Sequence, residues 1–334
     1  MPDERFLAVR LGSLGDIVHA LPAVAALRES FPNARLDWLV QRKWGALVAA
    51  CPDVTSTIAF DPGSWWAMRR CVQALRSARY TCAIDFQGLY KSALLTALSG
   101  VSRRIGFDRA AAREGGAAVF YSHRVHPPGG HVIEQNLALA EAAGARRAEV
   151  RFPLRVPAEA EEEMARWLQE RQVREFFVVS PGGGWRSKCW PPDRYGELCL
   201  ALERRYGWRG VVNYGPGEKA LADAVIRGAR DAEPLFYSSE LPQLMALLCG
   251  AKFVVAGDTG PLHLAVALGT PAAGLYGPTD PQRNGPYCAA DIVVRNARPG
   301  ETTYKRGGEY SPAMLSISVE QVLAAVERRL GIAG

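Results

Sequence analysis

The sequence of 334 residues lacks the features of several large protein classes. Its seven cysteines are odd in number and include no C-x-x-C pair, so neither a disulfide framework nor a zinc cluster is expected. No apolar run reaches the roughly 18 residues that a membrane-spanning helix needs. The first residues pass from charges directly into a short apolar run, so we expect no signal peptide and a reducing, cytoplasmic location.

Three motifs of nucleotide- and metal-dependent enzymes are also missing from the sequence. The G-x-G-x-x-G fingerprint of dinucleotide-binding folds is absent, which disfavours a dehydrogenase. No Gly-Lys-Ser or Gly-Lys-Thr occurs, so there is no Walker A motif. No Asp-x-Asp pair occurs, so a metal-bridged diphosphate is not supported, and we expect neither a metal nor another cofactor.

The composition is that of an ordinary globular protein, with 48% hydrophobic and 22% charged residues. Residues 1–150 hold 18 Lys and Arg against 13 Asp and Glu, whereas residues 151–334 hold 22 against 21. This excess in the first half indicates an anionic partner, or it serves only solubility. The basic residues are scattered and form no recognised nucleic-acid motif, so we expect no nucleic-acid partner and consider an acidic substrate or a membrane surface instead.

Short apolar runs alternate with longer amphipathic segments, which is typical of an α/β fold with doubly wound parallel sheets. The length favours two domains, and the Pro-bounded segment 151–157 has no helical period. We expect one Rossmann-like domain at 1–155, a second at 156–317 and a final helix within 318–334. Expected strands are 6–11, 36–40, 57–60, 82–86, 104–107, 176–180, 210–213, 253–256 and 272–276; the helices between them include 17–29 and 193–206.

The first expected strand leads into Leu-Gly-Ser-Leu-Gly-Asp, which ends at Asp16 and is followed by a helix. A strand, a glycine turn and a helix N-terminus offer backbone N–H groups to an anion. Asp16 itself has two interpretations. It is either the N-cap of the helix or a general base directed at a substrate.

The second domain opens with Ser-Pro-Gly-Gly-Gly-Trp at 180–185, followed by Lys188. Glycines let the backbone approach a ligand closely, and Gly183 and Gly184 are the candidates here. Lys188 supplies a compact charge that suits a phosphate. The alternative is a flexible loop with a solvated lysine.

The densest signal is Gly-Asp-Thr-Gly-Pro-Leu-His at 257–263, directly after an apolar strand. Asp258 or Thr259 can cap a helix that begins near Pro261, a residue favoured in the first helical turn. The free N–H groups of such a helix suit a diphosphate. His263 lies in that first turn and is either a structural histidine or a ligand contact.

Five stretches together resemble the lipopolysaccharide heptosyltransferases, glycosyltransferase family nine, and they occur in the family's order along nearly the whole chain. Within the family, the first two stretches are most similar to the members that add the first heptose to Kdo on lipid A. The stretches are 14–22 (LGDIVHALP), 84–89 (IDFQGL), 188–191 with Lys188 and Trp-Pro, 257–263 (GDTGPLH) and 276–281 (YGPTDP).

The resemblance implies a GT-B fold and inverting transfer of L-glycero-D-manno-heptose from ADP-heptose, with the last helix packing back on the first domain. Asp16 is then the general base. The donor contacts that it implies are Gly183, Gly184, Lys188, Glu218, Asp258, Thr259, Gly260 and His263. The acceptor contacts are Gly15, Arg109, Arg113 and His131.

The implied acceptor is Kdo-lipid A, an anionic glycolipid, which fits the basic first half and a peripheral location on the inner face of the inner membrane. The segment 65–70 (WWAMRR) pairs aromatic and basic residues as interfacial segments do, or it starts a core-facing helix. Two alternatives stay open: transfer to a later inner-core heptose, another glycan or a protein, and a non-catalytic nucleotide-sugar-binding module.

Overall fold

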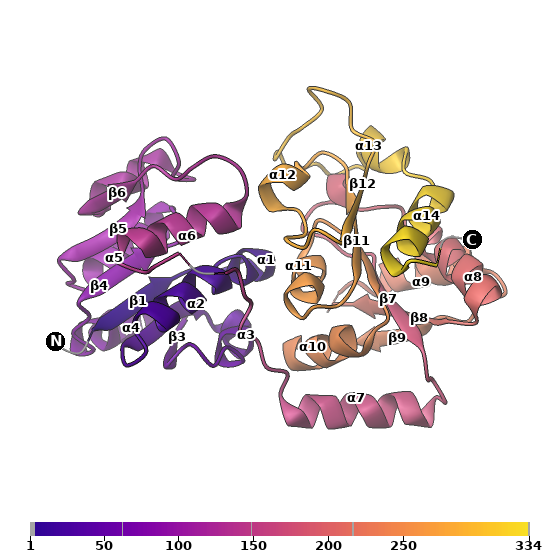
Figure 1. The fold of residues 1–334 in the computed structure, drawn as a ribbon, viewed down its shortest axis with the longest axis horizontal. Helices are drawn as coiled ribbons and strands as arrows, with labels where there is room; N and C mark the ends of the chain where they lie inside the picture. Colours follow the sequence, from indigo (N-terminus) through magenta and orange to yellow (C-terminus); the bar gives the residue numbers. More distant parts are fainter. Residues whose placement is uncertain (1–3, 62, 148, 216, 333–334) are drawn as a thin grey trace. The chain divides into compact units, whose positions relative to one another are not determined.

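The computed structural model describes residues 4–61, 63–147, 149–215 and 217–332. The chain forms two compact units, Met1–Arg155 and Val156–Gly334. Each unit is built on one six-stranded parallel sheet with helices on both faces (Figure 1). The two doubly wound α/β domains expected from the sequence are therefore confirmed.

The first unit has the strand order β3-β2-β1-β4-β5-β6. Its helices α2 and α6 pack together on one face of the sheet, while α4 and α5 cover the other. The strands are β1 (Arg5–Val9), β2 (Arg35–Gln41), β3 (Ser56–Phe60), β4 (Cys82–Asp85), β5 (Arg103–Phe107) and β6 (His123–Val125). The helices are α1 (Leu14–Val18), α2 (Leu21–Ser30), η1 (Arg42–Trp44), α3 (Gly45–Ala49), α4 (Trp65–Ser77), α5 (Tyr90–Leu98), η2 (Gly115–Phe120) and α6 (Val132–Ala142).

The second unit repeats this plan with the order β12-β11-β10-β7-β8-β9. Its strands are β7 (Phe176–Ser180), β8 (Arg209–Tyr214), β9 (Leu235–Ser238), β10 (Val254–Gly257), β11 (Ala272–Tyr276) and β12 (Ile292–Arg295). Its helices are α7 (Ala158–Glu170), η3 (Arg186–Lys188), α8 (Pro192–Tyr206), α9 (Lys219–Ala229), α10 (Leu241–Gly250), α11 (Gly260–Ala267), α12 (Pro281–Asn284), α13 (Pro312–Leu315) and α14 (Val319–Leu330).

The central strands consist of apolar residues, which suits strands with another strand along each edge and helices over both faces. Strand β1 pairs with β2 and β4, with Phe6 opposite Leu36 on one side and Cys82 on the other. Strand β7 lies likewise between β10 and β8. In the first sheet the strands that follow β1 are added first on one side of it (β2, β3) and then on the other (β4 to β6). In the second sheet β8 and β9 lie on one side of β7, and β10 to β12 lie on the other. The strand order therefore reverses beside β1 and beside β7, and each reversal is a switch point. Ligands of open α/β sheets bind at such points, at the carboxyl ends of the strands.

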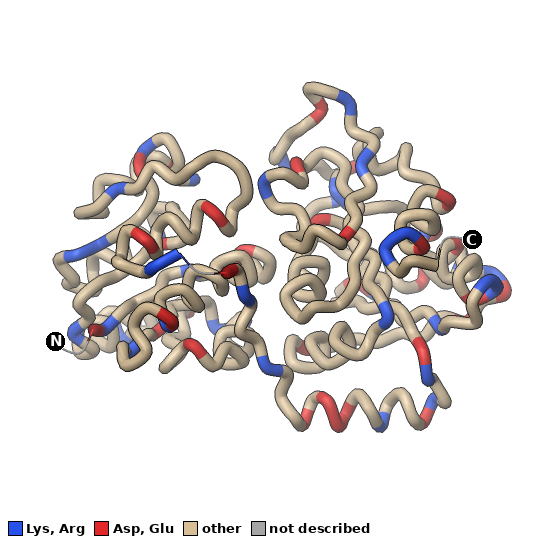
Figure 2. The backbone as a smooth tube through the Cα atoms, in the orientation of Figure 1, with Lys and Arg blue, Asp and Glu red and all other residues tan. Residues whose placement is uncertain are grey.

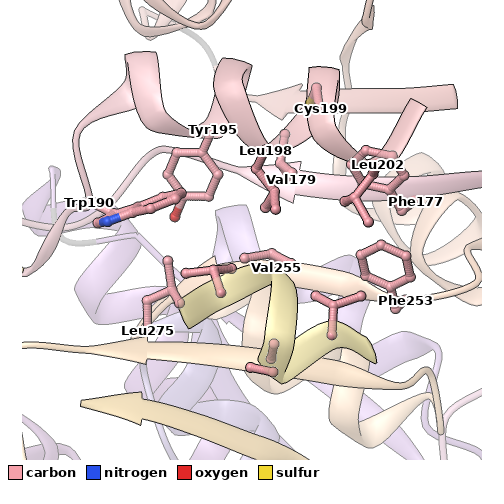
Figure 3. Close-up of a cluster of buried hydrophobic side chains, with 14 of the residues drawn as sticks. Phe177, Val179, Trp190, Tyr195, Leu198, Cys199, Leu202, Phe253, Val255 and Leu275 are labelled. Carbon is pink, nitrogen blue, oxygen red and sulfur yellow. The ribbon is translucent and has the colours of Figure 1, made fainter. Parts of the chain in front are cut away.

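The core of the second unit shows how its amphipathic helices are held. Figure 3 shows side chains of α8, among them Tyr195 and Leu202, facing Phe177 of β7 and Phe253, the residue before β10. The two phenylalanine rings stack with centroids 5.0 Å apart.

The last helix packs within the second unit. Its buried residues Val322, Ala325 and Val326 belong to the core of that unit, where α14 packs against α8, β11 and β12. Its apolar face is therefore covered within its own unit. The expected helix at 17–29 is wrong as a single element. It breaks into α1 and α2, because Pro22 has no N–H to continue the hydrogen bonding of the first helix.

Charge is interspersed rather than gathered in one stripe, and Figure 2 shows acidic residues grouped mainly in the first half of α7. Among the helices of the described residues, none is long and apolar enough to cross a membrane.

Candidate functional site

The first candidate centre is the loop that follows β1 at the switch point. Ser13 occupies the N-cap position of α1, and Asp16 is the third residue of the helix. The Asp16 carboxylate accepts hydrogen bonds from the Ser13 backbone N–H and hydroxyl, both at 3.1 Å. The N-cap is therefore Ser13 rather than Asp16. The Ser13 N–H, one of the backbone groups expected to bind an anion, already donates to the Asp16 side chain.

Asp16 is surrounded by positive charge. Its Oδ1 lies 2.7 Å from Nη2 of Arg10, and its Oδ2 lies 3.8 Å from Nη1 of Arg113. Burial disfavours the charged carboxylate, but Arg10 and the hydrogen bond from Ser13 outweigh it, and the pKa of Asp16 falls to about 2. Asp16 is thus a carboxylate at neutral pH, with 27% of its side chain exposed to receive a ligand.

Arg10 is a residue that the sequence analysis missed. It is only 5% exposed, it bonds the Phe86 carbonyl oxygen through Nη1, and its own carbonyl accepts a hydrogen bond from Trp38. A buried arginine needs a charge partner, and Asp16 provides it. The available signal was a single charge inside the apolar run Phe-Leu-Ala-Val-Arg-Leu at 6–11.

The segment after β4 holds this arrangement in place. The Gln87 side chain accepts a hydrogen bond from the Leu11 N–H at 2.8 Å, which joins the β4 and β1 loops. Asp85 is fully buried and accepts hydrogen bonds from the Tyr121 hydroxyl at 2.7 Å and the Gln87 N–H at 2.8 Å. Burial raises the pKa of Asp85 against these hydrogen bonds. The stretch 84–89 therefore supports the Asp16 loop.

Gly88 brings the Arg113 loop to the same centre. Gly88 has a φ of +67°, and a Cβ there would lie 3.2 Å from the backbone nitrogen of Arg113. Only glycine fits this backbone and this approach well. Arg113 reaches Asp16, whereas Arg109 is exposed, with its carbonyl against Gly115.

Two further acceptor candidates lie at the end of α1. Gly15 is buried in the helix, and its carbonyl accepts a hydrogen bond from the His19 N–H. The His131 ring meets the His19 ring edge-on, with centroids 5.6 Å apart. His131 caps α6 by accepting a hydrogen bond from Ile133. His19 adds to the charges that lower the pKa of Asp16, so this neighbour links His131 to Asp16.

The second candidate centre lies at the switch point of the other sheet. Asp258 follows β10 and is almost fully buried. It accepts a hydrogen bond from Asn284 at 2.7 Å, lies 3.1 Å from Nε2 of His263 and pairs with Lys188 at 3.5 Å. Burial opposes its charge, but His263 and Lys188 prevail and hold the pKa of Asp258 well below its usual range. Asn284 was not among the expected residues.

Thr259 and Gly260 begin the helix beside this cluster. Thr259 is the N-cap of α11, and Gly260 is its first residue. The Thr259 hydroxyl donates to the Gly257 carbonyl at 3.2 Å. The backbone N–H groups of the first turn therefore lie next to the Asp258 cluster, as expected for a diphosphate site.

The loop after β7 completes the second centre. Lys188 lies over the Trp185 ring at 4.3 Å and is largely buried, so it is not a solvated lysine. A Cβ on Gly183 would lie 2.7 Å from the Cys189 sulfur and 3.4 Å from Thr259, so the loop is close-packed there. Gly184 has open space beside it.

Glu218 belongs to the same edge of the second sheet. It precedes α9, and its carboxylate accepts a hydrogen bond from the Gly215 N–H at 2.8 Å. A Cβ on Gly182 would collide with this carboxylate, so Gly182 rather than its glycine neighbours brings the β7 loop against Glu218. The candidate donor residues are thus grouped at adjoining strands.

A model of glycosyltransferase family 9 (heptosyltransferase) matches residues 68–313. This chain belongs to glycosyltransferase family 9. Lipopolysaccharide heptosyltransferase 1 of Pseudomonas aeruginosa is 31% identical over 327 residues, covering 92% of this chain and 88% of the relative. The protein of the same name from Escherichia coli K12 is 30% identical, covering 88% and 94%. The resemblance noted in the sequence is confirmed, and the chain is a glycosyltransferase.

Solved structures agree with this assignment. The E. coli heptosyltransferase WaaC with ADP superposes with a TM-score of 0.75 at 26% identity, covering 98% of this chain and 99% of that one. E. coli ADP-heptose lps heptosyltransferase II superposes at 0.79 with 22% identity, covering 98% of each chain, which shows the shared GT-B fold.

Proposed function

We propose that this enzyme transfers heptose from ADP-heptose to the lipopolysaccharide inner core, and that its acceptor is the Kdo of lipid A. Similarity along nearly the full length to proteins named lipopolysaccharide heptosyltransferase 1 carries the proposal. The solved WaaC structure with ADP-2-deoxy-2-fluoro heptose, 27% identical to this chain, supports the donor.

In the proposed reaction Asp16 removes the proton from the acceptor hydroxyl. A sugar hydroxyl is a weak nucleophile, and a carboxylate base assists its attack on the anomeric carbon. The oxygen–carbon bond forms as the bond to the ADP oxygen breaks, which inverts the anomeric centre. Because the pKa of Asp16 is about 2, its carboxylate is ready to accept the proton at neutral pH.

The second unit is proposed to bind the donor and to stabilise the leaving ADP. Lys188 and the first turn of α11 direct positive potential at the place where negative charge develops. Glu218 fits the donor ribose, since a carboxylate accepts hydrogen bonds from sugar hydroxyls and this one lies against the β7 loop at Gly182. The Asp258 cluster orients Lys188 and His263 beside the sugar.

The acceptor is proposed to contact the first unit through Gly15, Arg109, Arg113 and His131. The exposed Arg113 side chain beside Asp16 suits the carboxylate of Kdo. An acceptor anchored in lipid implies a peripheral location at the inner face of the inner membrane.

A donor-by-acceptor activity matrix tests the proposal. ADP-heptose and ADP-glucose would each be offered with Kdo-lipid A and with Kdo-lipid A whose Kdo already carries one heptose. We expect turnover with ADP-heptose and Kdo-lipid A, and a product linkage inverted relative to the donor by NMR. Turnover only with the heptosylated acceptor would move the reaction to a later core heptose. ADP binding without turnover on any acceptor would indicate a non-catalytic module.

A further inference from the structure

The start of helix α4 carries two tryptophans that the described residues leave uncovered. Trp65 and Trp66 are 73% and 64% exposed. The helix buries Cys71 and Leu75 in the core of the first unit, with Met68 packed beside them. Its opposite face is therefore aromatic at the first turn. Single exposed apolar side chains are common, but adjoining ones rimmed by polar residues mark an interaction surface.

Basic residues surround the two tryptophans. Arg69 and Arg70 lie one turn further along α4, and the Arg69 guanidinium lies 6.0 Å from the centre of the Trp66 ring. Segments 41–46, 61–70 and 89–94 together hold five Lys and Arg and a single acidic residue, Asp61; a second carboxylate, that of Glu114, accepts a hydrogen bond from the Tyr90 N–H, so the surface stays positive. An anionic surface complements this charge, whereas a neutral or basic protein partner does not.

Contacts join these segments into one surface of the first unit. Lys91 at the start of α5 lies over the Phe60 ring at 4.8 Å, and Phe60 ends the strand that leads into α4. Tyr90 and Leu94, one helical turn apart on α5, add exposed apolar area of 53% and 45%. We name the surface formed by Trp65, Trp66, Arg69, Arg70, Tyr90 and Lys91 the rim patch.

The rim patch adjoins the Asp16 loop. It lies where β3 and β4 end, at the carboxyl edge of the sheet that also carries Asp16 after β1. Arg42 in η1 lies 3.9 Å from Asp61 in the loop before α4. Trp44, the last residue of η1, packs against the Asp16 loop, because a Cβ on Gly12 would lie 2.7 Å from Nε1 of Trp44.

We propose that the rim patch docks the first unit on an anionic lipid bilayer, with Trp65 and Trp66 inserted at the level of the headgroups. Tryptophan prefers this interface because its ring is amphipathic, and arginine pairs with the lipid phosphates. Docking would bring the Asp16 loop to the surface in which a lipid-anchored acceptor is held. This inference rests on the proposed function in one respect: an acceptor anchored in lipid requires the enzyme to bind at a membrane.

Vesicle cosedimentation without any substrate tests the docking. Phosphatidylglycerol–phosphatidylethanolamine vesicles would be compared with phosphatidylcholine vesicles, using the full chain, Trp65→Ser/Trp66→Ser and Arg69→Gln/Arg70→Gln. The control is Ile226→Ser, because Ile226 is 48% exposed on the second unit. We expect the tryptophan pair to weaken binding to anionic vesicles by about tenfold or more. The arginine pair should weaken it roughly 25-fold, an effect that high salt removes.

Brominated lipids give a second readout. Bromine atoms in the lipid quench the fluorescence of tryptophans that lie close to them. Of the eight tryptophans of the chain, Trp65 and Trp66 should account for nearly all of the quenching. Unaltered binding and quenching in the tryptophan variant would overturn the proposal, as would failure of the unaltered chain to bind anionic vesicles. Conversion of a dimer to a monomer by the tryptophan variant, with vesicle binding unchanged, would overturn it in favour of an interface between copies.

Activity on two acceptors separates this proposal from the proposed function. The tryptophan variant should keep its turnover on a de-acylated, water-soluble Kdo acceptor and lose turnover on acceptor held in vesicles. If vesicle docking is normal but neither acceptor is used, the proposed function fails and the rim patch stands.

Discussion

The two domains place one buried or half-buried aspartate each at a switch point, yet the two residues are held in different ways. Asp16 has 27% of its side chain exposed and faces an arginine that is itself 57% exposed. Asp258 has 5% exposed and is enclosed by Lys188, His263 and Asn284. Both have a lowered pKa, but the Asp16 side chain has the larger exposed surface to offer a substrate hydroxyl.

We propose that this difference separates a group that exchanges a proton from a group that orients others. Both carboxylates have several donors, but the partly exposed one can also meet a substrate, whereas the enclosed one fixes the groups that point at it. The proposed roles are therefore proton transfer for Asp16 and positioning for Asp258. The predictions that follow test this division of roles, beginning with the largest effect.

Replacement of the proposed base should have the largest effect. Asp16→Asn keeps the size of the side chain and an acceptor for Ser13 but cannot take up the proton. We expect kcat to fall by roughly 10²- to 10⁴-fold. ADP binding by calorimetry should be unchanged, because the proposed donor site lies in the second unit. Glu29→Gln, at an exposed acid of the same unit, serves as the control. Retained turnover in Asp16→Asn would rule out this base.

Loss of the buried lysine should act on donor binding instead. Lys188→Met keeps an unbranched side chain but removes the ammonium that lies over the Trp185 ring and pairs with Asp258. We expect the Kd for ADP to rise by about 10- to 100-fold, as for the loss of a hydrogen bond to a charged group. Lys252→Met is the matched control, since Lys252 lies at the amino end of β10 and pairs with Glu175. Equal Kd values in the two variants would place the diphosphate elsewhere.

The central strands and the local motifs could be predicted from sequence, whereas three of the four edge strands could not. Strands buried on both faces are continuous apolar runs, as β7 and β10 are. The missed strands β6, β9 and β12 are all edge strands. They have one pairing partner and one open edge, so sequences such as His-Arg-Val need no apolar alternation and look like loop.

The same contrast applies to the site residues. Asp258 and His263 are five residues apart, so one helix start brings them together and the sequence shows it. Lys188 and Asp258 are 70 residues apart, and Arg10 meets Phe86 across 76. Such pairings depend on the order of strands in the sheet. Asn284 was missed for this reason, because its partner Asp258 is a neighbour only in three dimensions.

Removal of Arg10 should change the pH profile more than the activity at neutral pH. Without the guanidinium, burial is opposed by fewer charges, so the pKa of Asp16 should rise toward or above its usual value. We expect the acidic limb of kcat/KM in Arg10→Met to move upward by about one pH unit or more. Arg10→Lys keeps a charge and should leave the limb low. An unmoved limb in Arg10→Met would mean that another group sets it.

Acid stability should show the smallest effect, and it tests the same ion pair. Since the pKa of Asp16 is about 2 in the folded chain and near its usual 3.8 in the unfolded one, its contribution is fully present above pH 4. It is lost as the pH falls toward 2, because the unfolded state binds the proton first. We expect at most about 2 kcal/mol from this group. Urea unfolding of Asp16→Asn should therefore depend less on pH between 4 and 2 than that of the unaltered chain. Identical slopes would show that the Arg10–Asp16 pair positions the base without stabilising the first unit.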